Sequence, residues 1–265
     1  MKTIELKQDE VRGVVRERYG DVAQGAPLCN PGSTCCSPNN NAGDMAKVLG
    51  YSDTEITAVP DGANLGLGCG NPLAIASLRP GQVVLDLGSG AGFDAFLAAR
   101  AVGPTGRVIG VDMTPAMISK ARANKARGDY AHVEFRLGEI EHLPVSDNCV
   151  DVILSNCVIN LSPDKAQVFS ETFRVLKPGG RLAISDMVGL KPFPAELPKD
   201  WELYTCCITG AALKSEIESI LHACGFVDIR VEPKPGSREV IQQWFPDRGL
   251  EEFVASATIE AVKPA

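Results

Sequence analysis

Three cysteines stand at points of the sequence where thiol chemistry is possible. Cys69 lies in the glycine-rich stretch NLGLGCGNP, Cys157 follows an apolar run in SNCVINL, and Cys207 lies in YTCCITGAAL. Soft thiolate sulfurs prefer soft, thiophilic ions. If the fold brings these three segments together, their thiols can hold such an ion, so the elements that carry them have to be identified.

The other cysteines of the nine have different surroundings. Cys149 and Cys224 stand beside apolar strand or helix positions, which favours burial. Cys206 adjoins Cys207 and fits either burial or ligation. The remaining three lie in an N-terminal loop: Cys29, Cys35 and Cys36. A structural zinc site is an alternative use of several thiols, but no CxxC pair occurs.

Composition indicates a globular protein in a reducing compartment. With 265 residues, 45% of them hydrophobic, the chain can bury a large core. The formal net charge of -7 gives no broad basic surface, which argues against nucleic acid as a partner. We find no long apolar run and no signal peptide, so we expect a cytoplasmic protein without a membrane partner. An odd number of cysteines also argues against a disulfide framework.

Apolar runs alternate with helical segments through the middle of the chain. Such runs predict buried parallel strands, here at 83–87, 107–111, 133–137, 150–154 and 182–185. Strand alternating with helix predicts a doubly wound α/β sheet. Two further strands are expected at 227–231 and 253–259. The last should be antiparallel, because the intervening stretch 233–247 is too short and too rich in proline and glycine for a firm crossover helix.

Helical segments are expected on both sides of these strands. Residues 1–20 carry apolar positions compatible with one amphipathic helix, and a long loop should follow over 21–41. Short helical pieces are expected at 45–49 and 71–78. Thr114-Pro115 and Ser162-Pro163 each pair a hydroxyl N-cap with proline at the first helical position, so each should open a helix.

The segment VVLDLGSGAGFDAF reads as a strand, a glycine-rich turn and the start of a helix. Gly88 and Gly90 permit positive φ angles and a close approach of the backbone to a ligand. A nicotinamide-binding fold would need a small third residue where this chain has Phe93. The loop instead resembles the first motif of class I S-adenosylmethionine methyltransferases, with Asp86 before the turn.

The resemblance continues through the next two segments. In RVIGVDMT, Asp112 ends the second predicted strand, where a carboxylate can accept both ribose hydroxyls. In GEIEHLPVSDNCVDVI, the family pattern implies that Glu139 accepts the adenine amino group and that the Ile140 amide meets a ring nitrogen. The full set of cofactor residues that we expect is Asp86, Gly88, Ser89, Gly90, Asp112, Met113, Glu139, Ile140 and Asn156.

The methyl acceptor is indicated by the cysteines. Oxygen and nitrogen acceptors usually call for a base, but no histidine stands near the expected acceptor side, and SNCVINL replaces the DPPY-like motif of amino-group methyltransferases. The carboxyl ends of parallel strands converge on the ligand crevice, where Cys69, Cys157 and Cys207 can meet. The stretches LGLGCG, SNCVINL and CxxG around them resemble arsenite methyltransferases. In that family, the three matching cysteines coordinate arsenic and a fourth, N-terminal cysteine acts in catalysis or redox exchange, for which Cys35 and Cys36 are candidates.

The resemblance implies that trivalent arsenic exchanges onto the three thiolates and that its lone pair accepts the methyl group without a general base. Thioredoxin or glutathione would then restore the oxidised cysteines, and we expect a monomer. Two alternatives stay open. One is a C- or O-methyltransferase acting on a quinone- or sterol-like small molecule. The other is a metalloid-binding protein without turnover.

The expected organisation has three parts. A seven-stranded, doubly wound and mainly parallel sheet of the class I methyltransferase type would centre on an S-adenosylmethionine-binding domain over residues 71–190. An N-terminal helix and Cys-rich extension would occupy 1–70. A C-terminal region over 191–265 would complete the sheet and cap the acceptor side, because Cys207 has to reach Cys157.

Overall fold

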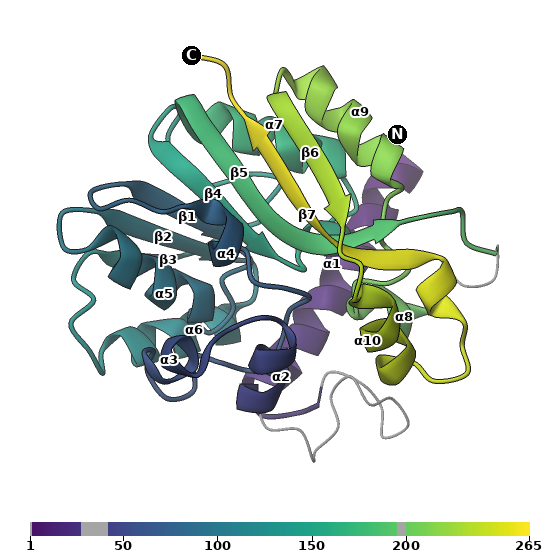
Figure 1. Ribbon diagram of the computed structural model, residues 1–265, viewed down its shortest axis with the longest axis horizontal. Coiled ribbons are helices and arrows are strands. Elements are labelled where there is room, and N and C mark those ends of the chain that lie inside the picture. Colours follow the sequence, from purple (N-terminus) through teal and green to yellow (C-terminus); the bar gives the residue numbers. More distant parts are fainter. Residues whose placement is uncertain (1, 28–41, 195–199) are drawn as a thin grey trace.

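A seven-stranded sheet forms the centre of the computed structural model, which describes residues 2–27, 42–194 and 200–265 (Figure 1). Its strands follow the order β3-β2-β1-β4-β5-β7-β6. The strands are β1 Val83–Leu87, β2 Arg107–Asp112, β3 Val133–Leu137, β4 Val150–Asn156, β5 Leu176–Gly189, β6 Val227–Pro233 and β7 Val254–Val262. Every predicted strand is present, and the fold is that of the class I methyltransferases.

The sheet is mainly parallel, as we expected, and it is mixed because one strand runs in the opposite direction. The strands β1 to β5 pair in parallel, but β7 runs antiparallel to both β5 and β6. The antiparallel last strand is therefore confirmed. The strand order reverses between β1 and β4, and ligands of doubly wound sheets bind beside such a point, at the carboxyl ends of the strands. The glycine turn after β1 and Cys157 after β4 both stand there.

Helices cover both faces of the sheet, which explains why its strands are apolar on both sides. The helices of the described residues are α1 Lys2–Ala23, α2 Ala42–Val48, α3 Asp53–Thr57, α4 Leu73–Ala76, α5 Phe93–Val102, α6 Pro115–Lys125, α7 Lys165–Val175, α8 Trp201–Thr205, α9 Lys214–Cys224 and α10 Ser237–Trp244. Neighbouring strand residues point to opposite faces. Val84 therefore packs in the cluster with α4, α5 and α6, whereas Leu85 packs in the cluster with α7 and α9.

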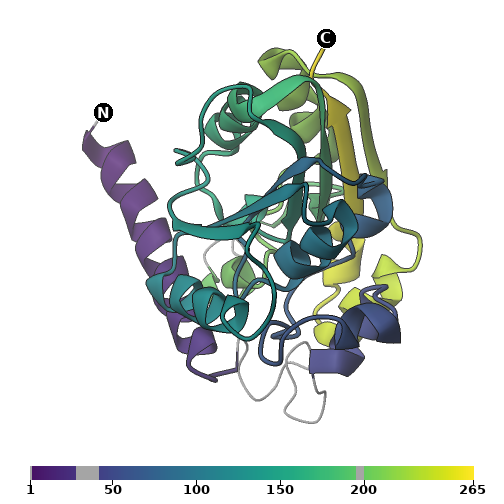
Figure 2. The same ribbon diagram turned by 90° about the vertical axis from the view of Figure 1, so that its left-hand side faces the viewer.

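The N-terminal helix α1 lies along the outside of the molecule beside α6 (Figure 2). Val15 is buried, and the Tyr19 hydroxyl donates to the carbonyl of Thr205 in α8 at 3.1 Å. The predicted N-terminal helix is confirmed, as are the short helical pieces that form α2 and α4. Within the described ranges, each helix is too short or too polar to serve as a membrane span.

One expected helix start is confirmed and the other differs from the structure. Thr114 is the N-cap of α6 and is followed by proline, but its side chain makes no capping hydrogen bond. The helix after β4 starts later than we expected, because the carboxylate of Asp164 caps α7 instead of Ser162. The Ser162 hydroxyl is engaged elsewhere and donates to the buried carboxylate of Glu141 at 2.7 Å.

The stretch 233–247 contains the short helix α10, although its composition led us to expect no firm helix there. The antiparallel course of β6 and β7 requires no crossover, so this helix is free to pack elsewhere. Ile241 and Phe245 are buried in an apolar cluster that also contains Cys69 and Cys207. Burial of an apolar face stabilises a helix that its intrinsic propensity would not.

Candidate active site

The glycine turn after β1 is shaped for close approach. Gly88 and Gly90 have φ angles of 65° and 52°, which glycine adopts readily and other residues rarely do. A Cβ on Gly88 would collide with the side chain of Val158, so packing against the end of β4 requires glycine there. A Cβ on Gly90 would meet no described atom within 4 Å. The turn therefore leaves an open space beside its own backbone.

Acidic side chains gather around this space. Asp112 accepts hydrogen bonds from the amides of Gly90 at 2.9 Å and Thr114 at 2.8 Å, which fixes its carboxylate at the tip of β2. Burial raises the pKa of Asp86 well above its usual range, and the neighbouring charges of Asp94 and Asp112 raise it further. Burial also raises the pKa of Asp112. The acids thus form a desolvated, electronegative pocket.

Two buried polar atoms of the pocket lack a hydrogen-bond partner among the described residues, the Oδ2 atom of Asp86 and the Oγ atom of Ser89. Unpaired buried polar groups are rare in folded proteins, and a bound ligand, ion or water is one explanation for them. A cationic molecule with hydroxyl and amino groups would satisfy both atoms and offset the acidic charge. S-adenosylmethionine has these features, so the residues present fit this cofactor.

A cavity joins the glycine turn to the sulfur atoms. All of the predicted cofactor residues except Glu139 line it, as do Cys157 and Cys207. Cys69 is buried behind the cavity wall. The cofactor residues and two of the three predicted arsenic ligands therefore share one hollow, which lies at the carboxyl ends of β1, β2 and β4.

Glu139 lies outside the cavity and pairs with α1. Its carboxylate is 3.6 Å from the Nε atom of Arg12 and 3.1 Å from the guanidinium of Arg16. Arg12 also lies 3.5 Å from the buried carboxylate of Glu141, which lines the cavity. The sequence pattern gave no indication of this pairing, because α1 is more than a hundred residues away along the chain. The adenine contact of Glu139 stays a prediction.

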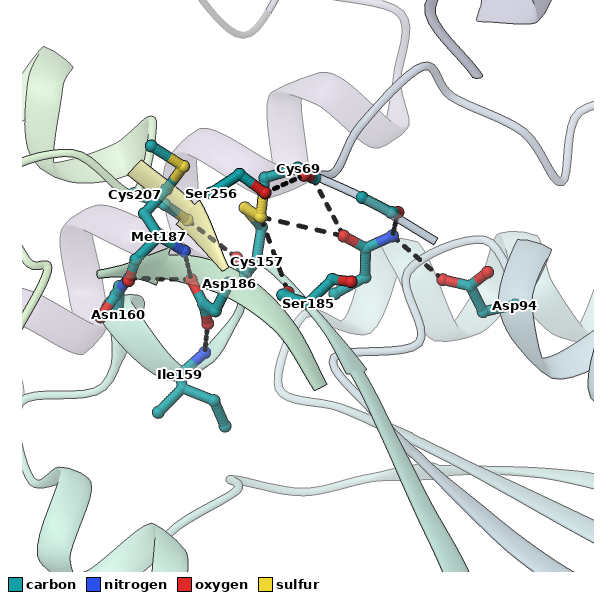
Figure 3. The surroundings of a disulfide bond; sticks show 12 residues. Cys69, Asp94, Cys157, Ile159, Asn160, Ser185, Asp186, Met187, Cys207 and Ser256 are labelled. Carbon is teal, nitrogen blue, oxygen red and sulfur yellow. Dashed lines mark hydrogen bonds between the residues drawn. A yellow bond between two sulfur atoms is a disulfide. The ribbon is translucent and has the colours of Figure 1, made fainter. Parts of the chain in front are cut away.

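The structure brings the three predicted arsenic ligands together (Figure 3). Cys69 and Cys157 form a disulfide bond with a Cα to Cα distance of 5.8 Å. The Sγ atom of Cys207 donates to the carbonyl of Cys157 at 2.8 Å. Burial, with the charges of Asp186 and Cys206, raises the pKa of Cys207 well above its usual range, so it is a protonated thiol at neutral pH. We expected three thiolates, whereas the structure holds a disulfide and a neutral thiol.

The backbone at two of these cysteines is unusual. Cys157 has a φ angle of 56° and Cys207 one of 61°, in the left-handed region that residues with a Cβ rarely occupy. Such a conformation costs about 1 kcal/mol or more and tends to persist at functional sites. The Cys157 amide is held there by the carbonyl of Ser185 at 2.9 Å. Sequence patterns do not reveal this feature.

Asn156 at the tip of β4 fixes the backbone around Cys69. Its Oδ1 atom accepts from the Cys69 amide at 3.0 Å, and its Nδ2 atom donates to the Gly70 carbonyl at 2.8 Å. The same nitrogen lies 3.1 Å from the hydroxyl of Tyr51 and 3.3 Å from the carboxylate of Asp94. Asn156 lines the cavity as expected, but its polar atoms are engaged by the protein.

Asp186 is a site residue that our sequence reasoning missed. Its side chain is 1% exposed. One of its carboxylate oxygens and the sulfur atoms of Cys69 and Cys157 all lie within 4.8 Å of one another. Burial raises its pKa to about 6. The sequence contains a signal that could have found it, since Asp186 directly follows the predicted strand 182–185 and so stands near the carboxyl edge of the sheet.

The remaining cysteines differ in their surroundings. Cys206 lines the cavity beside Cys207. We expected Cys149 and Cys224 to be buried, and both pack against the core but are only partly buried. The candidates for an N-terminal redox cysteine lie outside the described residues: Cys29, Cys35 and Cys36.

Apolar side chains from several elements surround the sulfur atoms. Val15 of α1, Leu203 of α8 and Ile241 of α10 belong to the same buried cluster as Cys69 and Cys207. The helices α1, α8 and α10 come from both ends of the chain and lie near one another beside the carboxyl edge of the sheet (Figure 1). They limit the access of water to the sulfur atoms.

Known proteins that are similar to this chain are methyltransferases, in agreement with the geometry of the site. Residues 78–225 match the family model of a methyltransferase domain. Over 97% of its length the chain is 51% identical to an arsenite methyltransferase of Halobacterium salinarum, of which it covers 68%. It is 39% identical to an arsenite methyltransferase of Aquipseudomonas alcaligenes over 83% of its length, and it spans 64% of that protein.

A solved structure is similar as well. This chain is similar to the crystal structure of an arsenic(III) S-adenosylmethionine methyltransferase from Chlamydomonas reinhardtii, with a TM-score of 0.61 and 32% sequence identity. The match covers 85% of this chain and 74% of the Chlamydomonas chain. The segment 78–225 that matches the family model contains the glycine turn, the acids at the tips of β1 and β2, Cys157 and Cys207. The chain therefore belongs to the arsenite methyltransferase family of S-adenosylmethionine-dependent methyltransferases.

Proposed function

We propose that this chain transfers methyl groups from S-adenosylmethionine to trivalent arsenic held by Cys69, Cys157 and Cys207. The observation that carries the proposal is the meeting of these three cysteines, two of which line one end of a cavity whose other end is the acid-lined glycine turn. Trivalent arsenic with three sulfur ligands keeps a lone pair, and thiolates are the ligands that soft ions prefer.

The cofactor would be held at the acidic end of the cavity. We assign Asp112 to its hydroxyl groups, and Asp86 with Ser89 to its charged or polar groups, because these atoms are buried and two of them are unpaired. When bound, S-adenosylmethionine supplies an electrophilic methyl group, which an arsenic lone pair can accept without a general base. The turn at Gly88 and Gly90 provides the close backbone approach.

The thiols bind arsenic by exchange. Arsenite has three hydroxyl groups, and each thiol that replaces one forms a sulfur to arsenic bond and releases one water molecule. The neutral Cys207 thiol is suited to this step, because its proton leaves with the displaced hydroxyl oxygen. Rigid backbone contacts from Asn156 to Cys69 and from Ser185 to Cys157 keep the sulfur atoms in place. The apolar cluster from α1, α8 and α10 limits water at the site.

A thiol reductant belongs to the proposal. Sulfur atoms joined in the Cys69–Cys157 disulfide cannot bind arsenic, so two electrons and two protons are needed to open the site. A dithiol such as thioredoxin, or glutathione, would supply them and become a disulfide. We propose that Cys35 or Cys36 takes part in this exchange and that the enzyme acts as a monomer in the reducing cytoplasm.

We also propose that three segments of the chain have the separate roles that the sequence implies. Residues 71–190 would bind the cofactor, the extension over 1–70 would contribute Cys69 and the redox cysteine, and residues 191–265 would supply Cys207 and the cap.

A methyl-transfer assay tests this function. The reduced protein is incubated with labelled S-adenosylmethionine alone, with arsenite, or with a quinone precursor, each with and without a dithiol. We expect label in methylated arsenic species only when arsenite and dithiol are both present. Transfer to the quinone precursor but not to arsenic would show a carbon or oxygen methyltransferase. Arsenite binding without transfer would indicate a sequestering protein.

A further inference from the structure

We propose that the reduced thiols of Cys69 and Cys157, together with Asp186, form a binding site for a divalent cation of the zinc class. This site shares two sulfur atoms with the arsenic site and differs in its third ligand. The proposal rests on the grouping of one carboxylate oxygen with two sulfur atoms, all within 4.8 Å of one another (Figure 3).

Cys207 is not a member of this group. Its Sγ atom is directed to the carbonyl of Cys157, with which it makes a hydrogen bond of 2.8 Å. Figure 3 shows Asp186 beside the disulfide, with its own partners on the side away from the sulfur atoms. The three ligands come from the segment before β1, from the tip of β4 and from β5.

The donor set suits zinc in number and type. Zinc binds thiolate, imidazole and carboxylate ligands in tetrahedral sites, often with three protein ligands and one open position. With zinc to sulfur bonds of about 2.3 Å and zinc to oxygen bonds of about 2.1 Å, tetrahedral ligand atoms lie roughly 3.6 to 3.8 Å apart. The carboxylate oxygen lies within 4.8 Å of both sulfur atoms, and the two sulfur atoms have to move apart to the tetrahedral spacing once the disulfide is reduced.

Asp186 is already oriented as a ligand. Its Oδ1 atom accepts from the Met187 amide at 2.7 Å and from the Asn160 side chain at 2.8 Å, which uses both lone pairs. Its Oδ2 atom accepts from the Ile159 amide at 2.9 Å, and the backbone amide of Asn160 also interacts with the carboxylate. These contacts hold the carboxylate in one orientation, with one of its oxygens beside the two sulfur atoms. Hydrogen bonds of this kind fix metal-ligating carboxylates in many sites.

The charges of such a site balance. Two thiolates and one carboxylate carry three negative charges, and zinc supplies two positive charges. Lys165 lies close enough to Asp186 for their charges to interact, and it supplies the third. Binding releases two protons from the thiols, and no electron transfer is involved after the disulfide has been reduced. Arsenic, by contrast, reaches a neutral complex with three sulfur atoms and needs no carboxylate.

The experiment is a metal titration of the whole chain. The protein is reduced with a water-soluble phosphine, which becomes a phosphine oxide with oxygen from water, and the phosphine is then removed. Co²⁺, Cd²⁺ and Zn²⁺ are titrated without arsenic or cofactor. We expect one ion per chain, with thiolate-to-metal charge-transfer absorption of an intensity that corresponds to two thiolates.

Three variants separate this site from the arsenic site. Cys207→Ser should retain the cation and lose arsenite, whereas Cys157→Ser should lose both. Asp186→Asn should weaken zinc roughly tenfold or more, since even outer-shell partners cost 10- to 100-fold, and should change arsenite binding much less. Cys149→Ser is the control, because Cys149 lies at the opposite end of β4, where its thiol contacts the Ser146 carbonyl.

The outcome is decisive in either direction. Absence of bound cation, absorption from three thiolates, or loss of zinc in Cys207→Ser would overturn the proposal, as would parental zinc affinity in a folded Asp186→Asn protein. If Asp186→Asn does not fold, the thiolate count and the Cys207→Ser titration still decide. Because these titrations contain neither arsenic nor cofactor, failure of the proposed methyl transfer would not affect them.

Discussion

The side chain of Asn156 offers a sharp test of how Cys69 is positioned. Replacing it by alanine removes the acceptor for the Cys69 amide and the donor for the Gly70 carbonyl, at 3.0 and 2.8 Å. An unpaired buried group costs about 1 to 3 kcal/mol. Asn156 is half-buried at the cavity wall, so water can replace part of these bonds. We therefore expect the two groups to cost about 2 kcal/mol together.

The loss of these hydrogen bonds should lower both the melting temperature and the affinity for arsenite. For a chain of this size, about 2 kcal/mol corresponds to a fall in Tm of roughly 4 to 8 °C. The Ser256 hydroxyl still donates to the Cys69 carbonyl, but the Cys69 amide is no longer held. Arsenite affinity should therefore fall by about tenfold, which is about 1.4 kcal/mol. Affinity for S-adenosylmethionine should change much less, since the unpaired atoms of Asp86 and Ser89 are untouched.

Three quantities are measured on the reduced protein. Differential scanning calorimetry gives Tm, and titration calorimetry gives the affinities for arsenite and for S-adenosylmethionine. Tyr51→Phe is the matched control, because it removes another partner of Asn156 without touching Cys69 or Gly70. It should lower Tm and leave arsenite affinity near the parental value. If Asn156→Ala weakens the cofactor as much as arsenite, Asn156 is chiefly a cofactor ligand and the positioning argument is wrong.

Three other predictions follow from the same geometry. Asp112→Ala should weaken S-adenosylmethionine binding by about 1.5 to 3 kcal/mol, as expected for hydrogen bonds to a charged group; calorimetry giving the parental affinity would remove Asp112 from the site. Alanine at Gly88 or Gly90 should lose stability because both positions have positive φ angles, and Gly88→Ala should lose more because its Cβ also collides with Val158. Gly90→Ala meets no atom and should also lose cofactor affinity, which urea titration with binding assays would show. Burial raises the pKa of Asp186 to about 6, from an ordinary value of 3.8, so the folded state binds this proton more tightly than the unfolded state. The proton therefore stabilises the folded protein by about 3 kcal/mol below pH 4, and this contribution is lost as the pH rises to 6. The free energy of unfolding should fall over this pH range in the parent and stay flatter in Asp186→Asn.

Much of the fold could be predicted because its signals are local. The strand at 83–87 is a short apolar run before a glycine turn, and the structure places β1 at those residues. The three cysteines could be grouped because strand ends of a doubly wound sheet converge. Both inferences need only the order of elements along the chain.

The parts that could not be predicted depend on contacts between distant segments. Ser162 has the sequence of an N-cap, but the buried carboxylate of Glu141 takes its hydroxyl. Glu139 meets arginines of α1, and Asn156 meets the backbone beside Cys69, across 123 and 87 residues respectively. Side-chain pairs of this kind leave no periodic signal, so only the folded chain reveals them.

The same holds for the state of the sulfur atoms. A pattern of three cysteines indicates ligands, but it does not distinguish thiolates from a disulfide between two of them. Nor does it show that Cys157 and Cys207 adopt left-handed φ angles. Asp186 could have been suspected from its place after a buried strand, whereas the hydrogen-bond donors that hold its carboxylate could not.

The measurement that tests the central claim most directly is methyl transfer by matched cysteine variants. Reduced parent, Cys157→Ser and Cys149→Ser proteins are given arsenite and labelled S-adenosylmethionine, and cofactor affinity is measured on the same samples. We predict that Cys157→Ser binds the cofactor with parental affinity and transfers no methyl group to arsenic, while Cys149→Ser transfers it at the parental rate. Methylation of arsenite by Cys157→Ser at the parental rate would contradict the account.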